Sequence, residues 1–441
     1  MKFQNELIKI CEKYPQLKLN FHYKIWETDF LRFYQSQINY NISKTSISLS
    51  TTIYKEKKSY SFSLKDPTKE ILQNKIDDVL KLIDQLPEDP DFVDLEDDLS
   101  KSTEKEKTNN IEKVSLEKKI EILEKFSQAV EPYNFKIYGT FICNYRTLHI
   151  VNSNGLNKRE ISSPIYLECK AVNQQNEVTV LEAYGGEKFD NFKEEEFTSN
   201  LVEKVIAATG KVVDVEAGKY EIVLAPRCIG EYFMYLESSI GASSLDSKQS
   251  FFEGKIDEKI FPENVTITDD PHHPDLINFD YNGDGHIYNK LPIIQNGVFK
   301  NFFVDNYYGR KLKMEKNGAE GAALVMNTGD KSLDELIGSV KNGLYISSLH
   351  YMNFINRKET SITGLTRDGT FLIEDGKITK VVNNLRFTEK ISDIIKGIVE
   401  IENKSYTIPY SSNYGEFGIY STRMPHVKVN GFKISSSTKT V

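Results

Sequence analysis

Residues 268–290, TDDPHHPDLINFDYNGDGHIYNK, contain five aspartates and three histidines, which are residue types that bind metal ions. Asp280, Asn282 and Asp284 match the first, third and fifth positions of a helix–loop–helix calcium loop. The twelfth position is Leu291 instead of the bidentate glutamate, and strand-like sequence follows where a helix is required. We therefore interpret the stretch as a polar β-turn and expect no calcium site.

The histidines give little support for a metal or catalytic centre. His272 and His273 are adjacent and lie between two prolines, so this segment is expected to be extended, with the two imidazoles pointing apart. His286, His350 and His426 are spread through the second half of the sequence. These five residues are the best material for an enzyme that acts alone, but their spacing gives no reason to expect that they converge.

Other chemical motifs are absent from the sequence. It has no Gly-x-Ser-x-Gly elbow, no phosphate-binding Gly-x-x-x-x-Gly-Lys-Ser/Thr loop, no His-Glu-x-x-His and no Cys-x-x-Cys pair. Motifs alone therefore indicate only a globular protein.

Composition excludes two classes of partner. The net charge of −8 argues against wide contact with nucleic-acid phosphates, which requires clustered lysine and arginine. No apolar run is long enough to cross a membrane, and acidic residues interrupt what would be the apolar part of an N-terminal signal peptide. We expect a cytoplasmic protein that has no membrane segment and does not bind nucleic acid directly.

Glycine usage divides the chain. Of 25 glycines, none precedes Gly139 and 21 lie from Gly210 onward, so a boundary is expected near residue 210, with one domain at 1–209 and another at 210–441. The second part also contains eight Asn-Gly or Asp-Gly dipeptides, including those at Asn296, Asp375 and Asn430. Such dipeptides are the strongest local signal for hairpin turns, so this part is expected to be mainly antiparallel β-sheet.

The first part mixes helices with strands. Apolar residues recur at helical spacing in 68–86 and in 115–130, the latter with Ser115 as a candidate N-cap. The stretch between them, about 87–110, is acidic and polar and is expected to be an exposed loop. Ribbons rich in Tyr, Thr, Ile and Phe at 31–54 and 134–155 read as strands. The expected fold class is α+β, with an N-terminal α/β domain of helices on an antiparallel sheet and a C-terminal, mainly antiparallel β domain.

Several stretches, taken in order, resemble the TldD/PmbA family, cytoplasmic proteins named as modulators of DNA gyrase and including metallopeptidases. They are FLRFYQSQINYNIS, VNSNGL, GKYEIVLAP, SFFEGKIDEKIFPENVTITDDP, IIQNGVFKNFFVDNYYGRKL, SLDELIGSVKNGLYI, TFLIEDGKITKV and MPHVKVNGFKIS. The resemblance covers nearly the whole chain and is strongest after residue 218.

The resemblance implies where a zinc site would lie. In the TldD branch a helix carries His-Glu-x-x-x-His, and a cysteine near the C-terminus completes the ligand set. In this sequence the two histidines correspond to Met234 and Ser239, and the glutamate, which would act as general base, corresponds to Tyr235. None of these residues can do the same work.

The other positions have changed as well. The family cysteine falls at Ser411 or Tyr414, and their segment, SSNYGEFG, contains neither Cys nor His. A shifted alignment would place Glu231 or Glu237 at the base position, but CIGEYFMYLESSIGAS contains no histidine in any register. The resemblance to the PmbA, or TldE, branch therefore implies a chain without its own zinc, although zinc is present in active family members.

The leading hypothesis is a zinc-less subunit that assists a TldD-like zinc peptidase in the proteolysis of flexible or modified peptides. Its expected partners are that TldD-like subunit and a peptide substrate, and the sequence is also compatible with a homo-oligomer. Two alternatives stay open. One is a peptidase that acts alone through other residues, and the other is a scaffold or gyrase-linked regulator without a role in proteolysis.

Overall fold

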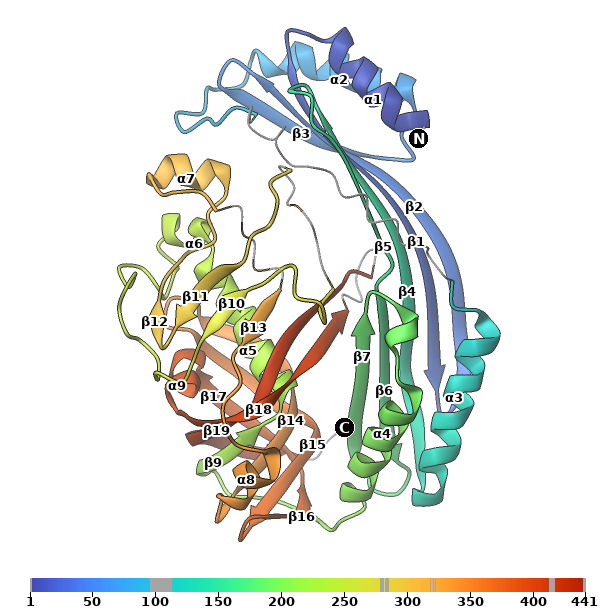
Figure 1. Cartoon of the computed structure of the whole chain (residues 1–441), viewed down its shortest axis with the longest axis vertical. Helices are drawn as coiled ribbons and strands as arrows, with labels where there is room; N and C mark the ends of the chain where they lie inside the picture. Colours follow the sequence, from blue (N-terminus) through green and yellow to red (C-terminus); the bar gives the residue numbers. More distant parts are fainter. Residues whose placement is uncertain are drawn as a thin grey trace.

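Two large sheets lie side by side in the molecule (Figure 1), which is described here by a computed structural model. The structure describes residues 2–95, 113–277, 281, 285–317, 319, 321, 323–411 and 417–438. The expected α+β class is confirmed, since a helix-covered antiparallel sheet is followed by a strand-rich C-terminal region.

The first sheet is built from the N-terminal half. Its strand order is β3-β2-β1-β4-β6-β7, with β5 also paired to β4, and every pairing in it is antiparallel. The elements of this half are α1 (Lys2–Lys13), β1 (Lys18–Tyr34), β2 (Gln37–Lys55), β3 (Lys58–Lys65), α2 (Lys69–Ile83), α3 (Leu116–Val130), the 3-10 helix η2 (Glu131–Tyr133), β4 (Phe135–Asn152), β5 (Asn157–Ser162), β6 (Ile165–Asn173), β7 (Thr179–Gly186), the 3-10 helix η3 (Phe189–Asn191) and α4 (Glu194–Ala207).

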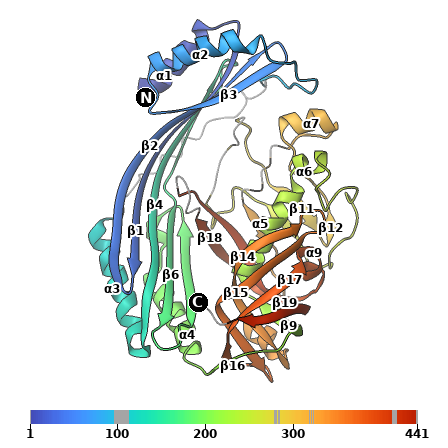
Figure 2. The same cartoon turned by 180° about the vertical axis from the view of Figure 1, so that it is seen from behind.

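The long strands β1, β2 and β4 form an arch along the molecule (Figure 2). Helices α1 and α2 pack at one end of the arch, and α3 and α4 pack near the other, each pair over its own apolar cluster. The helices expected over 68–86 and 115–130 are confirmed as α2 and α3. Thr68 and Ser115 cap them, because each hydroxyl accepts a backbone N–H from three residues further on.

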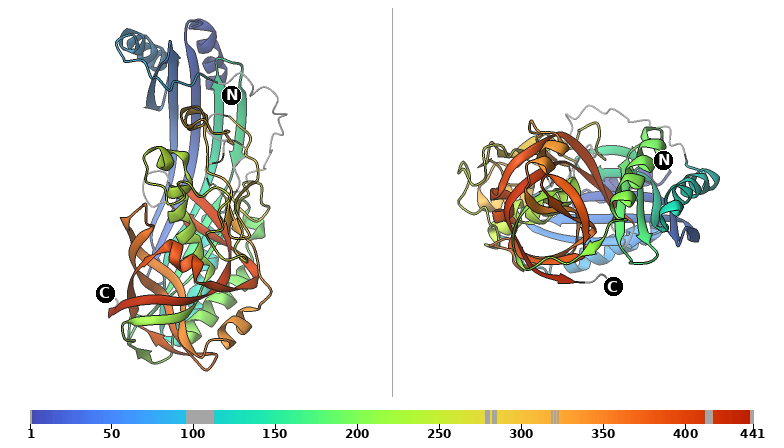
Figure 3. Two further views of the ribbon diagram at one scale, coloured as in Figure 1. Left: turned by 90° about the vertical axis from the view of Figure 1, so that its left-hand side faces the viewer. Right: turned by 90° about the horizontal axis from the view of Figure 1, so that it is seen from below.

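The second sheet is built from the C-terminal half and curls strongly (Figure 3). The elements of this half are β8 (Val212–Val213), β9 (Gly218–Leu224), α5 (Pro226–Ile240), α6 (Ala242–Asp246), β10 (Ile267–Asp269), β11 (Leu291–Gln295), β12 (Val298–Phe299), α7 (Asn306–Leu312), β13 (Leu324–Met326), α8 (Leu333–Gly338), β14 (Asn342–Asn356), β15 (Ser361–Glu374), β16 (Lys377–Val382), β17 (Asn384–Lys390), α9 (Ile391–Lys396), β18 (Ile398–Ser411) and β19 (Ile419–Thr438). Most pairings are antiparallel, while β9–β14, β8–β16 and β13–β19 are parallel.

Two of the expected hairpin turns are confirmed and one is wrong. Asn296-Gly297 joins β11 to β12 and Asp375-Gly376 joins β15 to β16, and all four residues have positive φ as a type I′ turn requires. Asn430-Gly431 instead lies inside β19, where the register with β9 shifts. Gly431 has the positive φ (+80°) expected for a turn. It forms a β-bulge instead, because the residues on both sides of it belong to the same strand.

The two halves share part of their apolar interior. Phe371 of β15 and Val381 of β16 belong to the cluster formed mainly by α3, α4, β4 and β6. The division at residue 210 remains a prediction.

The expected acidic loop, about 87–110, falls mostly outside the described residues. Residues 87–95 form no helix or strand, and Asp94 forms an ion pair with Lys18 at 2.6 Å. No helix within the described ranges is long and apolar enough to cross a membrane.

Candidate functional site

Helix α5 carries the positions at which the family resemblance places a zinc site. It follows β9 directly, with Pro226 at its first turn, where the missing N–H costs no hydrogen bond. One side of the helix is apolar and packs against the curled sheet through Cys228, Ile229, Tyr232, Phe233, Leu236 and Ile240. This packing fixes α5, so the side chains at the family positions have defined places.

Those side chains have structural roles. Met234 and Tyr235 line a cavity of about 520 Å³ together with Phe354. The Tyr235 hydroxyl donates a hydrogen bond to the Met352 carbonyl, and its ring lies 5.1 Å from that of Phe354. Ser239 is buried. The Tyr235 hydroxyl thus has a backbone partner, and none of the three positions offers an imidazole, a thiolate or a carboxylate.

The C-terminal end of β18 also lies against α5, as the resemblance requires. A side chain at Gly230 would meet the Tyr410 hydroxyl at 2.2 Å, so only glycine allows this close approach. The hydroxyl oxygen of Ser411 is buried and has no hydrogen-bond partner among the described residues. Tyr414 lies outside those residues.

These residues do not fit a zinc ion. Zinc in proteins takes thiolate, imidazole and carboxylate ligands, whereas the family positions offer a thioether, a phenol and hydroxyls. Across the described parts of the chain, no group of three His, Cys, Asp or Glu side chains could hold a metal ion. The three calcium-loop candidates Asp280, Asn282 and Asp284 lie outside these parts.

Glu231 is the ionisable group of greatest interest on α5. It is partly buried, and its carboxylate accepts the backbone N–H of Leu349. Burial raises its pKa to about 8; the charge of Arg227 opposes this shift, and the carboxylates of Asp368 and Glu168 add to it. A carboxyl group with this pKa can hold or release a proton near neutral pH.

Glu237, the other candidate base, lies against Gly321. Gly321 has φ +77°, which favours glycine, and a Cβ atom added there would lie 2.6 Å from the Glu237 Cγ, so the Glu237 side chain would have to shift. The structure thus places both glutamates on α5, and in the described parts of the chain neither belongs to a group of three His, Cys, Asp or Glu side chains that could hold a metal ion.

Glu231 belongs to a polar cluster that connects the two sheets. On β6, the Tyr166 hydroxyl donates to Glu168 at 2.5 Å. Across the boundary, Arg227 donates to the Pro409 carbonyl at 3.3 Å, and its charge interacts with both Tyr166 and Glu168. The one sequence signal for this cluster was the pair Glu168 and Lys170 in the otherwise apolar strand IYLECKAVN. Alternate residues of a strand share a face, so both side chains point to the same side.

The same boundary holds a second bridge. Lys170 of β6 forms an ion pair with Asp368 of β15 at 2.9 Å, and Thr179 of β7 donates to that carboxylate at 2.7 Å. Sequence reasoning did not single out these residues, because nothing local relates strands so distant in the chain.

The five histidines do not form a common site. His272 contacts the Tyr288 carbonyl, His273 accepts the Asp275 N–H, His286 contacts Lys316, His350 contacts Arg367, and His426 contacts Glu402. This arrangement gives no support to a catalytic centre built from them.

His426 is nevertheless part of a complete buried network. Its Nδ1 lies 2.6 Å from Glu402 Oε2, and its Nε2 lies 3.1 Å from the Tyr345 hydroxyl. The Tyr406 hydroxyl donates to Glu402 Oε1 at 2.9 Å. Burial lowers the pKa of His426 even though Glu402 opposes the shift, so the imidazole is neutral, with Nδ1–H donating to the carboxylate and Nε2 accepting from Tyr345.

Sequence comparison identifies the class of protein as a metallopeptidase family. Residues 109–209 match the PmbA/TldA metallopeptidase central domain, and residues 217–436 match the PmbA/TldA metallopeptidase C-terminal domain. The chain belongs to the TldD/PmbA family.

Three relatives show how far the likeness extends. A zinc metalloprotease TldD homolog from Saccharolobus solfataricus is 25% identical over 404 residues, covering 83% of this chain and 86% of the relative. The crystal structure of TldE from Thermococcus kodakarensis superposes with a TM-score of 0.81 at 20% identity, covering 98% of this chain and 99% of that one. A candidate modulator of DNA gyrase from Thermotoga maritima gives a TM-score of 0.79 at 16% identity, covering 98% and 99%.

Proposed function

We propose that this chain is the zinc-less, TldE/PmbA-like subunit of a heteromeric peptidase and that it assists a TldD-like zinc-bearing subunit in cleaving flexible or modified peptides. One observation carries the proposal. Helix α5 lies against β18, and the family resemblance aligns Met234, Tyr235 and Ser239 with the two zinc ligands and the general base of active members. A subunit that keeps the fold without the ligands is best explained by the surface it contributes to a complex.

The likeness to TldE supports this branch of the family through the fold. It extends over 98% of this chain and 99% of that one. We place the complex in the cytoplasm and assign it no direct contact with nucleic acid, in keeping with the net charge of −8.

Co-expression with a TldD-like homologue from the same organism tests the proposal. The two chains should elute together in size-exclusion chromatography, and the pair should cleave casein in a reaction that a chelator stops. This chain alone should not cleave it. Separate elution, together with a TldD-like chain that is equally active alone, would reject the subunit role and favour a scaffold or gyrase-linked regulator.

A further inference from the structure

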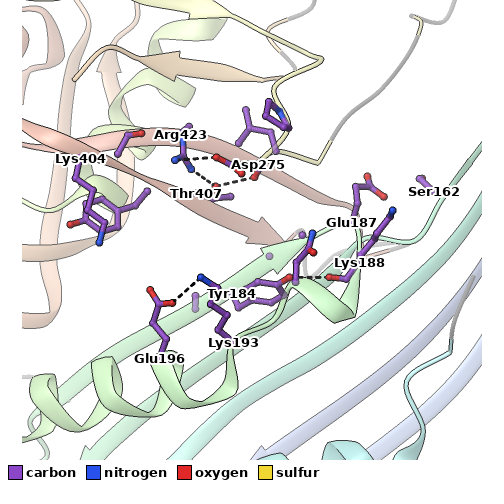
Figure 4. A pocket seen from close by; sticks show the side chains of 18 of the residues that line it. Ser162, Tyr184, Glu187, Lys188, Lys193, Glu196, Asp275, Lys404, Thr407 and Arg423 are labelled. Carbon is purple, nitrogen blue, oxygen red and sulfur yellow. Dashed lines mark hydrogen bonds and ion pairs between the residues drawn. The ribbon is translucent and has the colours of Figure 1, made fainter. Parts of the chain in front are cut away.

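A cleft of about 720 Å³ lies between strand β7 of the first sheet and strand β18 of the second (Figure 4). This volume is within the range of ligand-binding sites. Within the described residues, β7 pairs only with β6, and β18 has β19 as its one neighbouring strand. The cleft is therefore bordered by two strand edges.

The backbone of β18 directs free hydrogen-bonding groups into this cleft. Opposed residues in an antiparallel pair alternate between those that exchange hydrogen bonds and those that do not. Pro409 is opposite Ser421 and Pro425 is opposite Ser405, and neither proline has an N–H to complete a bonded pair. Ser405, Thr407 and Pro409 are alternate residues of the strand, so all three are at non-bonded positions. The backbone groups of Ser405 and Thr407 therefore point away from β19.

The edge of β18 is already used for pairing beside the cleft. Gly329 N–H donates to the Glu402 carbonyl at 2.7 Å, and Asn403 N–H donates to the Lys331 carbonyl at 2.6 Å. This pairing stops at Asn403. Among the residues that the structure describes, the backbone groups of Ser405 and Thr407 have no backbone partner beyond it.

The edge of β7 that faces the cleft also has backbone groups that point outward. Asn173 N–H donates to the Val178 carbonyl at 2.9 Å, which marks a hydrogen-bonded pair at the β6–β7 turn. Counting along the register from this pair, Leu181, Ala183 and Gly185 fall at non-bonded positions and point outward. The Leu181 carbonyl indeed accepts from a lysine of α4 at 2.8 Å.

The two edges meet at one end of the cleft. A Cβ atom at Gly185 would lie 2.3 Å from the Pro409 Cβ, so glycine is needed for the contact. No backbone hydrogen bond joins β7 to β18 within the described ranges. The contact closes this end and leaves the remainder open to an extended chain.

The charges of the cleft favour an anionic ligand. Its acidic residues already have basic neighbours, namely Asp275 with Arg423 at 3.1 Å, Glu196 with Lys193 at 3.7 Å, and Glu160 and Glu187 with the buried Arg146. Lys404 of β18 and Lys188 beyond β7 lie on opposite sides (Figure 4); neither takes part in an ion pair among the described residues, and Lys404 Nζ lies 4.9 Å from the centre of the Tyr406 ring. Two lysines are therefore available for carboxylates.

We infer that this cleft binds an extended acidic peptide segment, which adds to the edge of β18 as a further strand through Ser405 and Thr407. Backbone hydrogen bonds make such binding tolerant of sequence, and the two lysines select carboxylates. The inference rests on the proposed function only for its ligand class, a flexible peptide. It needs neither a metal nor the partner subunit.

The test uses the full chain alone and a short fluorescein-labelled peptide of alternating threonine and glutamate, with fluorescence anisotropy as the measurement. Thr407→Pro removes one of the two N–H groups, those of Ser405 and Thr407, that point into the cleft, and it leaves the β18–β19 ladder intact. It should weaken binding about tenfold, because a carbonyl of the bound peptide loses its donor. Thr407→Val is the matched control: it also removes the hydroxyl that donates to the Asp275 carbonyl, but it keeps the N–H and should bind within about twofold of the original.

A second arm changes the ligand and leaves the protein unaltered, so it decides the question even if Thr407→Pro fails to fold. The same peptide N-methylated at alternate residues should lose its binding, and a version with lysine in place of glutamate should bind at least about threefold more weakly. Equal binding of the N-methylated peptide, equal loss in Thr407→Val and Thr407→Pro, or no binding of the acidic peptide by the unaltered chain would each overturn the inference. Since the partner subunit is absent from the experiment, these outcomes are separate from failure of the complex to form.

Discussion

Two glutamates near the boundary between the sheets, Glu402 and Glu231, have opposite pKa shifts. Burial raises the pKa of Glu402, but hydrogen bonds from His426 and Tyr406 outweigh burial, and the pKa is lowered. Glu231 receives one backbone N–H and the charge of Arg227, and its pKa is raised to about 8. The number of donors aimed at a carboxylate thus decides its ionisation here, more than burial does.

The difference separates a complete hydrogen-bond network around Glu402 from a single ionisable group on α5. Glu402, His426, Tyr345 and Tyr406 satisfy one another, which is what a buried network needs in order to stabilise a fold. Glu231 lies on α5, the helix to which the family resemblance assigns the zinc ligands of active members, and its carboxyl group can hold or release a proton near neutral pH. Substitutions at the two glutamates should therefore have different effects on stability.

The largest effect is expected from Glu402→Gln. The amide keeps the shape of the side chain but cannot accept hydrogen bonds at both ends, so one buried donor of His426 or Tyr406 loses its partner. We expect a loss of about 3 kcal/mol in the free energy of unfolding, measured by urea denaturation at pH 7. Glu231→Gln is the matched control and should cause no loss at that pH; a loss as large as that of Glu402→Gln would remove the distinction.

Much of the fold followed from sequence, because local signals carried it. Helices α2 and α3, the Ser115 cap and the turns at Asn296 and Asp375 depend on residues close in the chain. The hairpin turn predicted at Asn430-Gly431 was wrong, because a glycine with positive φ can form a β-bulge as well as a turn.

The polar clusters could not be predicted in the same way. Glu168 and Arg227 come together only when the two sheets dock, and no spacing in the sequence encodes that contact. Likewise, the free edge of β18 depends on which residues lie opposite its prolines, which only the register gives. The positions of the altered zinc site came from the family resemblance, and their role remains a proposal.

The second prediction concerns pH. The pKa of Glu231 is about 8 in the folded chain against an ordinary value of 4.5, so the folded state binds more protons than the unfolded state between these values, and stability falls as pH rises through this window. Glu231→Gln should remove this part of the decline and be the more stable form by roughly 1 kcal/mol at pH 8, after allowance for partial solvent screening.

Glu402 provides the opposite control. Its lowered pKa means that its stabilisation is present above 4.5 and is lost as pH falls below that value, so the defect of Glu402→Gln should shrink in acid. Thermal midpoints of the three proteins from pH 4 to pH 9 measure both windows. Parallel curves for Glu231→Gln and the unaltered chain would contradict the raised pKa.

A smaller effect is expected from Tyr345→Phe. The hydroxyl donates to Nε2 of neutral His426, and its removal leaves a buried imidazole acceptor without a donor. The loss should be about 1 kcal/mol, below that of Glu402→Gln because no charged group loses a partner. In a double-mutant cycle, Tyr345→Phe should cost less in the Glu402→Gln background than alone; full additivity would show that the network does not act as a unit.

The smallest change is expected where the family chemistry would be restored. Met234→His, Tyr235→Glu and Ser239→His together supply two imidazoles and a carboxylate on α5. The third ligand would still be missing at the end of β18, and the hydroxyl of residue 235 that now contacts the Met352 carbonyl would be lost. Zinc catalysis needs ligands and their supporting groups held to within roughly half an ångström, and this cavity is shaped by packing against Phe354 instead.

We therefore expect no chelator-sensitive cleavage of casein by the triple variant, and elemental analysis should find far less than one zinc per chain in both it and the unaltered protein. Stoichiometric zinc with cleavage in the variant would show that α5 still holds a nearly complete catalytic site and that its difference from the Glu402 network is only one of side chains.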